Sequence, residues 1–236
     1  MRILSRILIA LLVAGMAATA PAGATELTPH KARYDVRIKL ISGQLDTELR
    51  PTSGGYFARH VIRATGLSRI LTSGRMDFSS EFRAGPDGLA PVWYRAVDTI
   101  RDDPETRIRF DWDTNEAAGT FGNEEVLVEL DGIAYDKVSI QYELMHDLLN
   151  GGTGETYVLF DVEKLRVAHV TKVGQKSVAT QAGIFEVVGV RHQREGSSRA
   201  TTFWFAPQLD YLPVIIEQHR KGKLNFRASL TEYTTP

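Results

Sequence analysis

The residues best suited to catalysis or metal binding are scattered along this sequence. No two of the six histidines lie within five residues of each other: His30, His60, His146, His169, His192 and His219. Metal sites that a sequence reveals place their ligands at short, regular spacings, and these histidines show none. The chain has no cysteine, which excludes thiolate ligands, disulfides and a cysteine nucleophile. We therefore predict no metal, no cofactor and no catalytic residue.

Two acidic segments resemble functional sites only in part. Residues 111–115 begin as a calcium-binding loop does, but Glu116 stands where such a loop needs glycine and Gly122 where it needs glutamate. We predict that this segment is a strand that runs into a turn. The acidic cluster at 102–105 contains a proline and predicts a solvated hairpin tip.

Large apolar side chains are the stronger candidates for a binding site. A sheet with a cavity would line it with such residues, whereas a sheet packed on a helix would bury the same residues as core. The sequence leaves both interpretations open. The residues that we predict for a ligand site are Ile108, Phe110, Trp112, Tyr142, Met145, Phe203 and Phe205.

Most of these residues belong to segments with the alternation of a β-strand. Apolar and charged side chains alternate over residues 33–39 and 107–112, and similar patterns recur at 158–162 and 224–230. Alternation places the apolar residues on one face and is typical of antiparallel sheets with one solvated face. We predict a mainly β protein in which a curved antiparallel sheet of roughly ten to twelve strands is partly closed into a barrel.

One segment departs from the strand pattern. Over residues 136–150 apolar side chains recur at helical spacing, Asp136 is suited to the N-cap, and two glycines follow the last turn. We predict an amphipathic helix at about 136–150 that the curved sheet wraps. A shorter helical turn is predicted at 67–71.

The first 24 residues predict an export signal. Arg2 and Arg6 precede the apolar run 7–16, and residues 22–24 (Ala-Gly-Ala) match a signal-peptidase site. The run is shorter than the roughly 20 residues that a bilayer span needs. We expect a Sec-type signal cleaved after Ala24, a periplasmic protein that spans no membrane after cleavage, and a single β-rich domain over 25–236.

The composition is that of a globular domain, with 43% hydrophobic and 24% charged residues. The formal net charge of -1 argues against a protein that binds nucleic acid through a strong basic field.

The order and spacing of several short segments resemble the bacterial exported family known as domain of unknown function 3108. The resemblance extends from about Tyr34 to Tyr233. The segments that carry it are 64–67, 110–112, the helix with Asp136, Ser139 and Tyr142, and then 182–185, 202–207 and 212–214. It implies an envelope protein of mainly antiparallel β structure and supplies no activity, cofactor or catalytic residue.

Three functions remain open from the sequence. The first is a non-enzymatic envelope protein that holds a lipid or another apolar ligand in the concavity of its sheet. The second is a structural or assembly factor that binds an envelope protein, since exposed strand edges can accept a partner strand. The third is an enzyme whose site only folding assembles, for example from histidines with Asp111 or Asp136.

Overall fold

The computed structural model describes residues 25–39, 41–85, 88–162 and 164–236. The predicted signal peptide, residues 1–24, lies outside the described residues. Within the described ranges, no helix is both long and apolar enough to cross a membrane.

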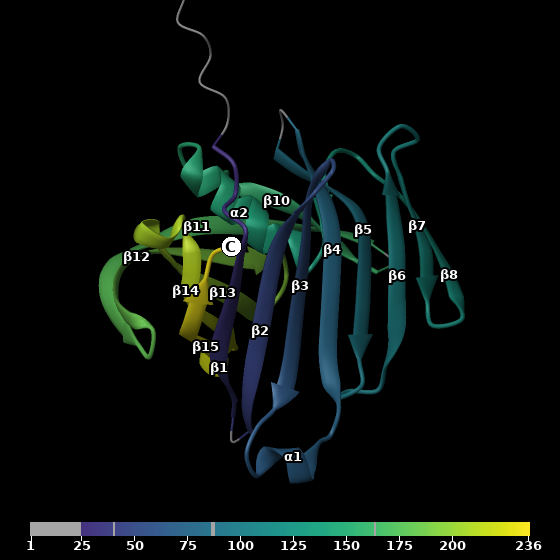
Figure 1. The fold of residues 1–236 in the computed structure, drawn as a ribbon. Helices are drawn as coiled ribbons and strands as arrows, with labels where there is room; N and C mark the ends of the chain where they lie inside the picture. Colours follow the sequence, from purple (N-terminus) through teal and green to yellow (C-terminus); the bar gives the residue numbers. More distant parts are fainter. Residues whose placement is uncertain (1–24, 40, 86–87, 163) are drawn as a thin grey trace, which may run out of the picture.

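The described chain forms one large β-sheet (Figure 1). Its first eight strands are β1 (His30–Ile38), β2 (Ile41–Thr52), β3 (Gly55–Ala64), β4 (Arg75–Gly85), β5 (Gly88–Asp98), β6 (Asp103–Asp111), β7 (Glu116–Phe121) and β8 (Glu124–Glu129). The others are β9 (Ala134–Tyr135), β10 (Thr156–Asp161), β11 (Lys164–Thr180), β12 (Gly183–Arg194), β13 (Arg199–Ala206), β14 (Leu212–Arg220) and β15 (Lys223–Thr234).

The strand order is β8-β7-β6-β5-β4-β3-β2-β1-β15-β14-β13-β12-β11-β10-β9. Every neighbouring pair is antiparallel except β9 and β10, which are parallel. Pairing of β1 with β15 joins the two halves of the chain at the middle of the sheet. The prediction of a mainly antiparallel β protein is therefore confirmed.

Two details of the predicted fold are wrong. The sheet has 15 strands instead of ten to twelve, and it is open, with β8 and β9 as its edges. The strand count was too low because β7, β8 and β9 are short and β11 exposes most of its length, so that these strands carry little apolar alternation.

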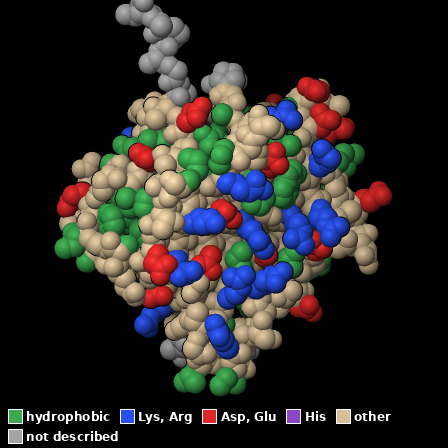
Figure 2. All heavy atoms as spheres, in the orientation of Figure 1, with side chains coloured by type: hydrophobic (Ala, Val, Ile, Leu, Met, Phe, Trp, Pro, Cys, Tyr) green, Lys and Arg blue, Asp and Glu red, His purple; other side chains and the backbone are tan. Residues whose placement is uncertain are grey.

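Alternation in β1 gives the sheet its two faces. Tyr34 and Val36 are buried on the inner face, while Arg33, Asp35 and Arg37 point outward. Figure 2 shows Lys and Arg side chains gathered on the outer face, with Asp and Glu side chains among them.

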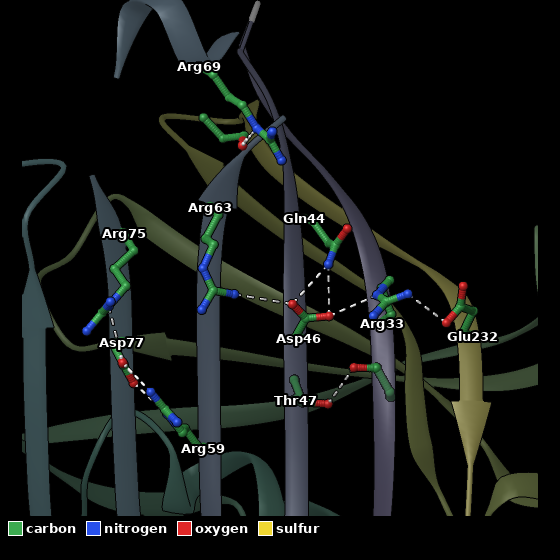
Figure 3. A network of polar contacts seen from close by, with 12 residues as sticks. Arg33, Gln44, Asp46, Thr47, Arg59, Arg63, Arg69, Arg75, Asp77 and Glu232 are labelled. Atoms are coloured by element: carbon green, nitrogen blue, oxygen red, sulfur yellow. Dashed lines mark hydrogen bonds and ion pairs between the residues drawn. The ribbon is translucent and has the colours of Figure 1, made fainter. Parts of the chain in front are cut away.

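Ion pairs between neighbouring strands organise this outer face (Figure 3). The Asp46 carboxylate forms ion pairs with Arg33 and Arg63, with N···O distances of 2.9 and 3.5 Å. The buried Asp77 carboxylate forms ion pairs with Arg59 and Arg75, with N···O distances of 2.6 and 3.4 Å. These ion pairs link charged side chains of β1–β4 across the outer face of the sheet.

The inner face curves around helix α2 (Ser139–Leu149), which lies against β4 and β5 (Figure 1). The helix was predicted to be amphipathic, yet eight of its 11 residues are buried, including Gln141 and Glu143. The prediction of an amphipathic helix is wrong in this respect because the sheet covers the helix on more than one side. The shorter predicted turn is α1 (Ser68–Leu71), between β3 and β4.

Candidate functional site

Phe203 is the member of the predicted ligand set that lines a pocket on the inner face of the sheet. Four others are packed in the core, each at most 5% exposed: Ile108, Phe110, Met145 and Tyr142. Phe205 has no exposed surface and stacks on Phe203, with ring centroids 5.5 Å apart. Trp112 is half-buried and donates its indole N–H to the carbonyl of Pro91 at 2.7 Å.

The pocket lies between the N-terminal end of α2 and strands β10 and β12–β15, and its volume is about 350 Å³. Side chains from seven elements, β9, α2, β10 and β12–β15, meet there although these elements are far apart in the sequence. The apolar part of the lining consists of Ile140, Leu159, Phe160, Phe203, Ile216 and Phe226. A concave apolar surface of this kind is typical of sites for small molecules.

Cations outnumber available anions in the pocket. Arg194 pairs with Asp161, but within the described part of the chain neither Lys137 nor Arg199 forms an ion pair. The remaining carboxylate, that of Asp136, is 1% exposed and is already engaged in hydrogen bonds. The pocket therefore favours a ligand with a negative charge.

His192 adds a polar contact to the apolar wall. Its ring stacks on Phe203 with centroids 5.7 Å apart, and its buried Nδ1 has no hydrogen-bond partner among the described residues. Burial, together with nearby Arg194, lowers the pKa of His192 to about 4, so the ring is neutral at neutral pH. A neutral imidazole can donate to or accept from a ligand atom.

Asp136 fixes the end of α2 beside the pocket. Its Oδ1 accepts the backbone N–H groups of Val138 at 2.7 Å and Ser139 at 3.0 Å, and its Oδ2 accepts the Ser80 hydroxyl at 2.7 Å. The Ser139 hydroxyl in turn accepts the Asp136 N–H at 2.9 Å. This reciprocal arrangement is a capping box, which satisfies backbone donors that a helix leaves free.

A second polar cluster on α2 was missed by the sequence analysis. Glu143, His146 and Asp147 occupy one face of the helix, and one potential ligand atom of each lies within 4.8 Å of the others. The signal in the sequence is the Glu-x-x-His-Asp spacing, which combines two carboxylates with a single histidine. Glu143 accepts the Leu89 N–H at 2.7 Å and Asp147 accepts the Tyr157 hydroxyl. Because these carboxylates already hold the helix to the sheet, we assign no ligand to them.

Two histidines that the sequence suggests are isolated meet in the core. His60 Nε2 is 3.1 Å from the Tyr142 hydroxyl, and the rings of His30 and Tyr142 have centroids 6.2 Å apart. Burial and the neighbouring His30 lower the pKa of His60 to about 3. His60 therefore stays neutral in the folded protein at pH values where it is protonated in the unfolded chain.

This difference predicts acid sensitivity. The folded pKa lies below the unfolded value of 6.5, so the contribution of His60 to stability is complete above pH 6.5 and falls as the pH decreases below it. Relative to a His60→Gln variant, the wild type should lose about 2 kcal/mol of unfolding free energy between about pH 7.5 and about pH 5. Urea unfolding at both pH values measures the loss. Parallel pH profiles for the two proteins would contradict the burial of a neutral His60.

An open, curved antiparallel sheet with a helix and a pocket on its inner face defines a barrel-like β protein. The chain belongs to the family described as "Protein of unknown function (DUF3108)", whose model matches residues 31–226. The resemblance noted in the sequence is thus confirmed. No curated protein is significantly similar to the chain.

The solved structures that match this chain include two bacterial proteins. One is the beta-barrel-like protein of domain of unknown function DUF1849 from Brucella abortus, with a TM-score of 0.63 and 15% identity over 90% of this chain and 100% of that chain. At this identity it supports the fold alone. The other is a protein with a YmcC-like fold from Bacteroides fragilis, with a TM-score of 0.34 and 12% identity over 89% of this chain and 97% of that chain. A TM-score this low supports no inference.

Proposed function

We propose that the protein is a non-enzymatic binding protein of the bacterial envelope that holds a small amphiphile with an acidic head group. The observation that carries this proposal is the apolar pocket of about 350 Å³, in which Arg199 and Lys137 form no ion pair with any described residue. Export to the periplasm rests on the predicted signal in residues 1–24. The sequence predicts an apolar ligand, and the cations of the pocket add the expectation that this ligand carries a negative charge.

The pocket volume limits the size of the ligand. Pockets for small molecules span about 300–1,000 Å³, and this one lies near the lower limit. That space suits a single acyl chain of medium length better than a lipid with two chains. The rings of Phe160, Phe203 and Phe226 would contact the chain.

The polar groups would orient the head group. Arg199 can present two N–H donors to one carboxylate, which is the strongest form of such a pairing. The His192 imidazole can supply a further hydrogen bond from the wall beside Phe203. Binding needs no bond to be made or broken, so the pocket acts by recognition alone.

Arg199→Gln should weaken the binding of decanoic acid at least about tenfold, because a hydrogen bond to a charged group contributes about 1.5–3 kcal/mol. Isothermal titration calorimetry with protein freed of lipid measures the change. Arg191→Gln is the matched control, since Arg191 is exposed in the same sheet and does not line the pocket. Equal affinities for the wild type and Arg199→Gln would refute the proposed role of the arginine.

The alternative of a protein partner added to a strand edge receives less support. Edge strand β8 has the sequence Glu-Glu-Val-Leu-Val-Glu, and charged side chains on an edge oppose pairing with another chain. The other edge, β9, has two residues, which is too short for a stable added strand.

A further inference from the structure

The turns at one end of the sheet carry an unusual combination of side chains. The pairing of Ile38 with Ile41, Arg63 with Arg75 and Arg220 with Lys223 places the β1–β2, β3–β4 and β14–β15 connections at the same end of the strands. Asp98 pairs with Asp103 next to the β5–β6 turn at this end as well. We call this region the α1 end, because α1 lies in its β3–β4 connection.

Two depressions at the α1 end are lined by cations and by no carboxylate. The first depression is lined by four cations: Lys39, Arg101, Arg199 and Arg220. The second is lined by three: Arg63, Arg69 and Arg75. Thr99 lines the second depression and Arg101 the first, so the two are neighbours along the β5–β6 turn. Ion pairs engage some of these side chains, such as Arg101 with the buried Asp98 at 3.2 Å. Lys39, Arg69, Arg199 and Arg220 form no ion pair within the described part of the chain.

Two apolar side chains project from the tip of this end. Leu67 is 83% exposed and Ile70 is 81% exposed, the largest values among the exposed large hydrophobic residues of the described chain. Their i, i+3 spacing places them on one side of the single turn of α1. Figure 2 shows hydrophobic side chains at this lower tip, below a group of Lys and Arg side chains.

We propose that the α1 end docks the protein on an anionic lipid bilayer. Leu67 and Ile70 would enter the interface between head groups and acyl chains, while the surrounding arginines contact lipid phosphates. Apolar side chains flanked by cations are the combination that binds a protein to the surface of an anionic membrane. The charge of the two depressions favours this occupant over a neutral or basic protein surface.

Docking would also place the ligand pocket next to the membrane. Arg199 lines both the pocket and the first depression, so the pocket lies next to the α1 end. Passage of an acidic amphiphile between bilayer and pocket rests on the proposed function, whereas docking itself does not. The two can be tested separately because vesicle binding is measured with ligand-free protein.

Co-flotation with vesicles tests the docking surface. The wild type should float with vesicles that contain phosphatidylglycerol and should not float with pure phosphatidylcholine. The double variant Leu67→Asp/Ile70→Asp should bind the anionic vesicles at least about tenfold more weakly, since it removes the inserted groups and adds negative charge. Arg69→Gln/Arg220→Gln should also bind more weakly and should depend less on salt concentration.

Ile184→Asp is the matched control. Ile184 is 76% exposed and lies beside the β11–β12 turn, where Thr180 pairs with Gly183 away from the α1 end. The control should float as the wild type does. Failure of the wild type to bind anionic vesicles would overturn the proposal, and so would equal losses for Ile184→Asp and the Leu67/Ile70 variant. A stoichiometric complex with a protein that is abolished by Leu67→Asp, without any vesicle binding, would assign the surface to that partner instead.

Discussion

Replacement of Asp136 by alanine should lower the free energy of unfolding by about 4 kcal/mol, because it removes a helix cap and leaves several buried donors without acceptors. The donors are the N–H groups of Val138 and Ser139 and the hydroxyl of Ser80. Asp136 is 1% exposed, so water cannot readily replace the lost acceptor. Urea denaturation followed by circular dichroism measures the loss.

Asp136→Asn provides the control for this prediction. The asparagine oxygen can still accept the two backbone N–H groups, and its NH₂ group can donate to the Ser80 hydroxyl. The substitution also removes a carboxylate whose pKa is raised by burial. Loss of this unfavourably buried charge limits the decrease in unfolding free energy. The asparagine variant should lie within about 1 kcal/mol of the wild type. A similar loss for both variants would show that the charge of Asp136, not its capping geometry, stabilises the end of α2.

Phe205→Ala should also cost about 4 kcal/mol, the usual effect of removing a fully buried phenylalanine ring. Phe205 has no exposed surface and packs against Phe203 on the inner face of β13. The same substitution at Phe57, which faces outward beneath Arg50 at 4.2 Å, should cost about 1 kcal/mol. Equal losses for the two alanine variants would contradict the assignment of Phe205 to the packed core.

The strands that the sequence predicted best are those with one wet face. In β1 and β6 the alternation of apolar and charged residues matches the alternation of buried and exposed positions. The helix was predicted because its apolar spacing is regular and Asp136 precedes it. Its burial on several sides was not predictable, since Gln141 and Glu143 resemble residues of a solvated face unless the curvature of the sheet is known.

The residues of the pocket were harder to predict from the sequence than the strands. Phe203 was predicted from its place in an aromatic strand, but Arg199 and His192 were not. Their proximity depends on the register of β12, β13 and β14, in which His192 faces Thr201 and Arg199 faces Arg220. Each of these pairings lies within one hairpin, but the pocket also needs Ile140 of α2 and Phe160 of β10, and no local pattern in the sequence places those two residues beside β12–β14.

The central claim is that the pocket holds an acidic amphiphile. The most direct test is native mass spectrometry of the lipid-free protein mixed with decanoic acid. The wild type should bind one decanoate per chain. Thr201→Phe, which places a ring in the space that Thr201 now lines, should bind none while remaining folded. A wild type that stays free of decanoate, or a Thr201→Phe variant that binds it equally well, would contradict the assignment of the pocket as a ligand site.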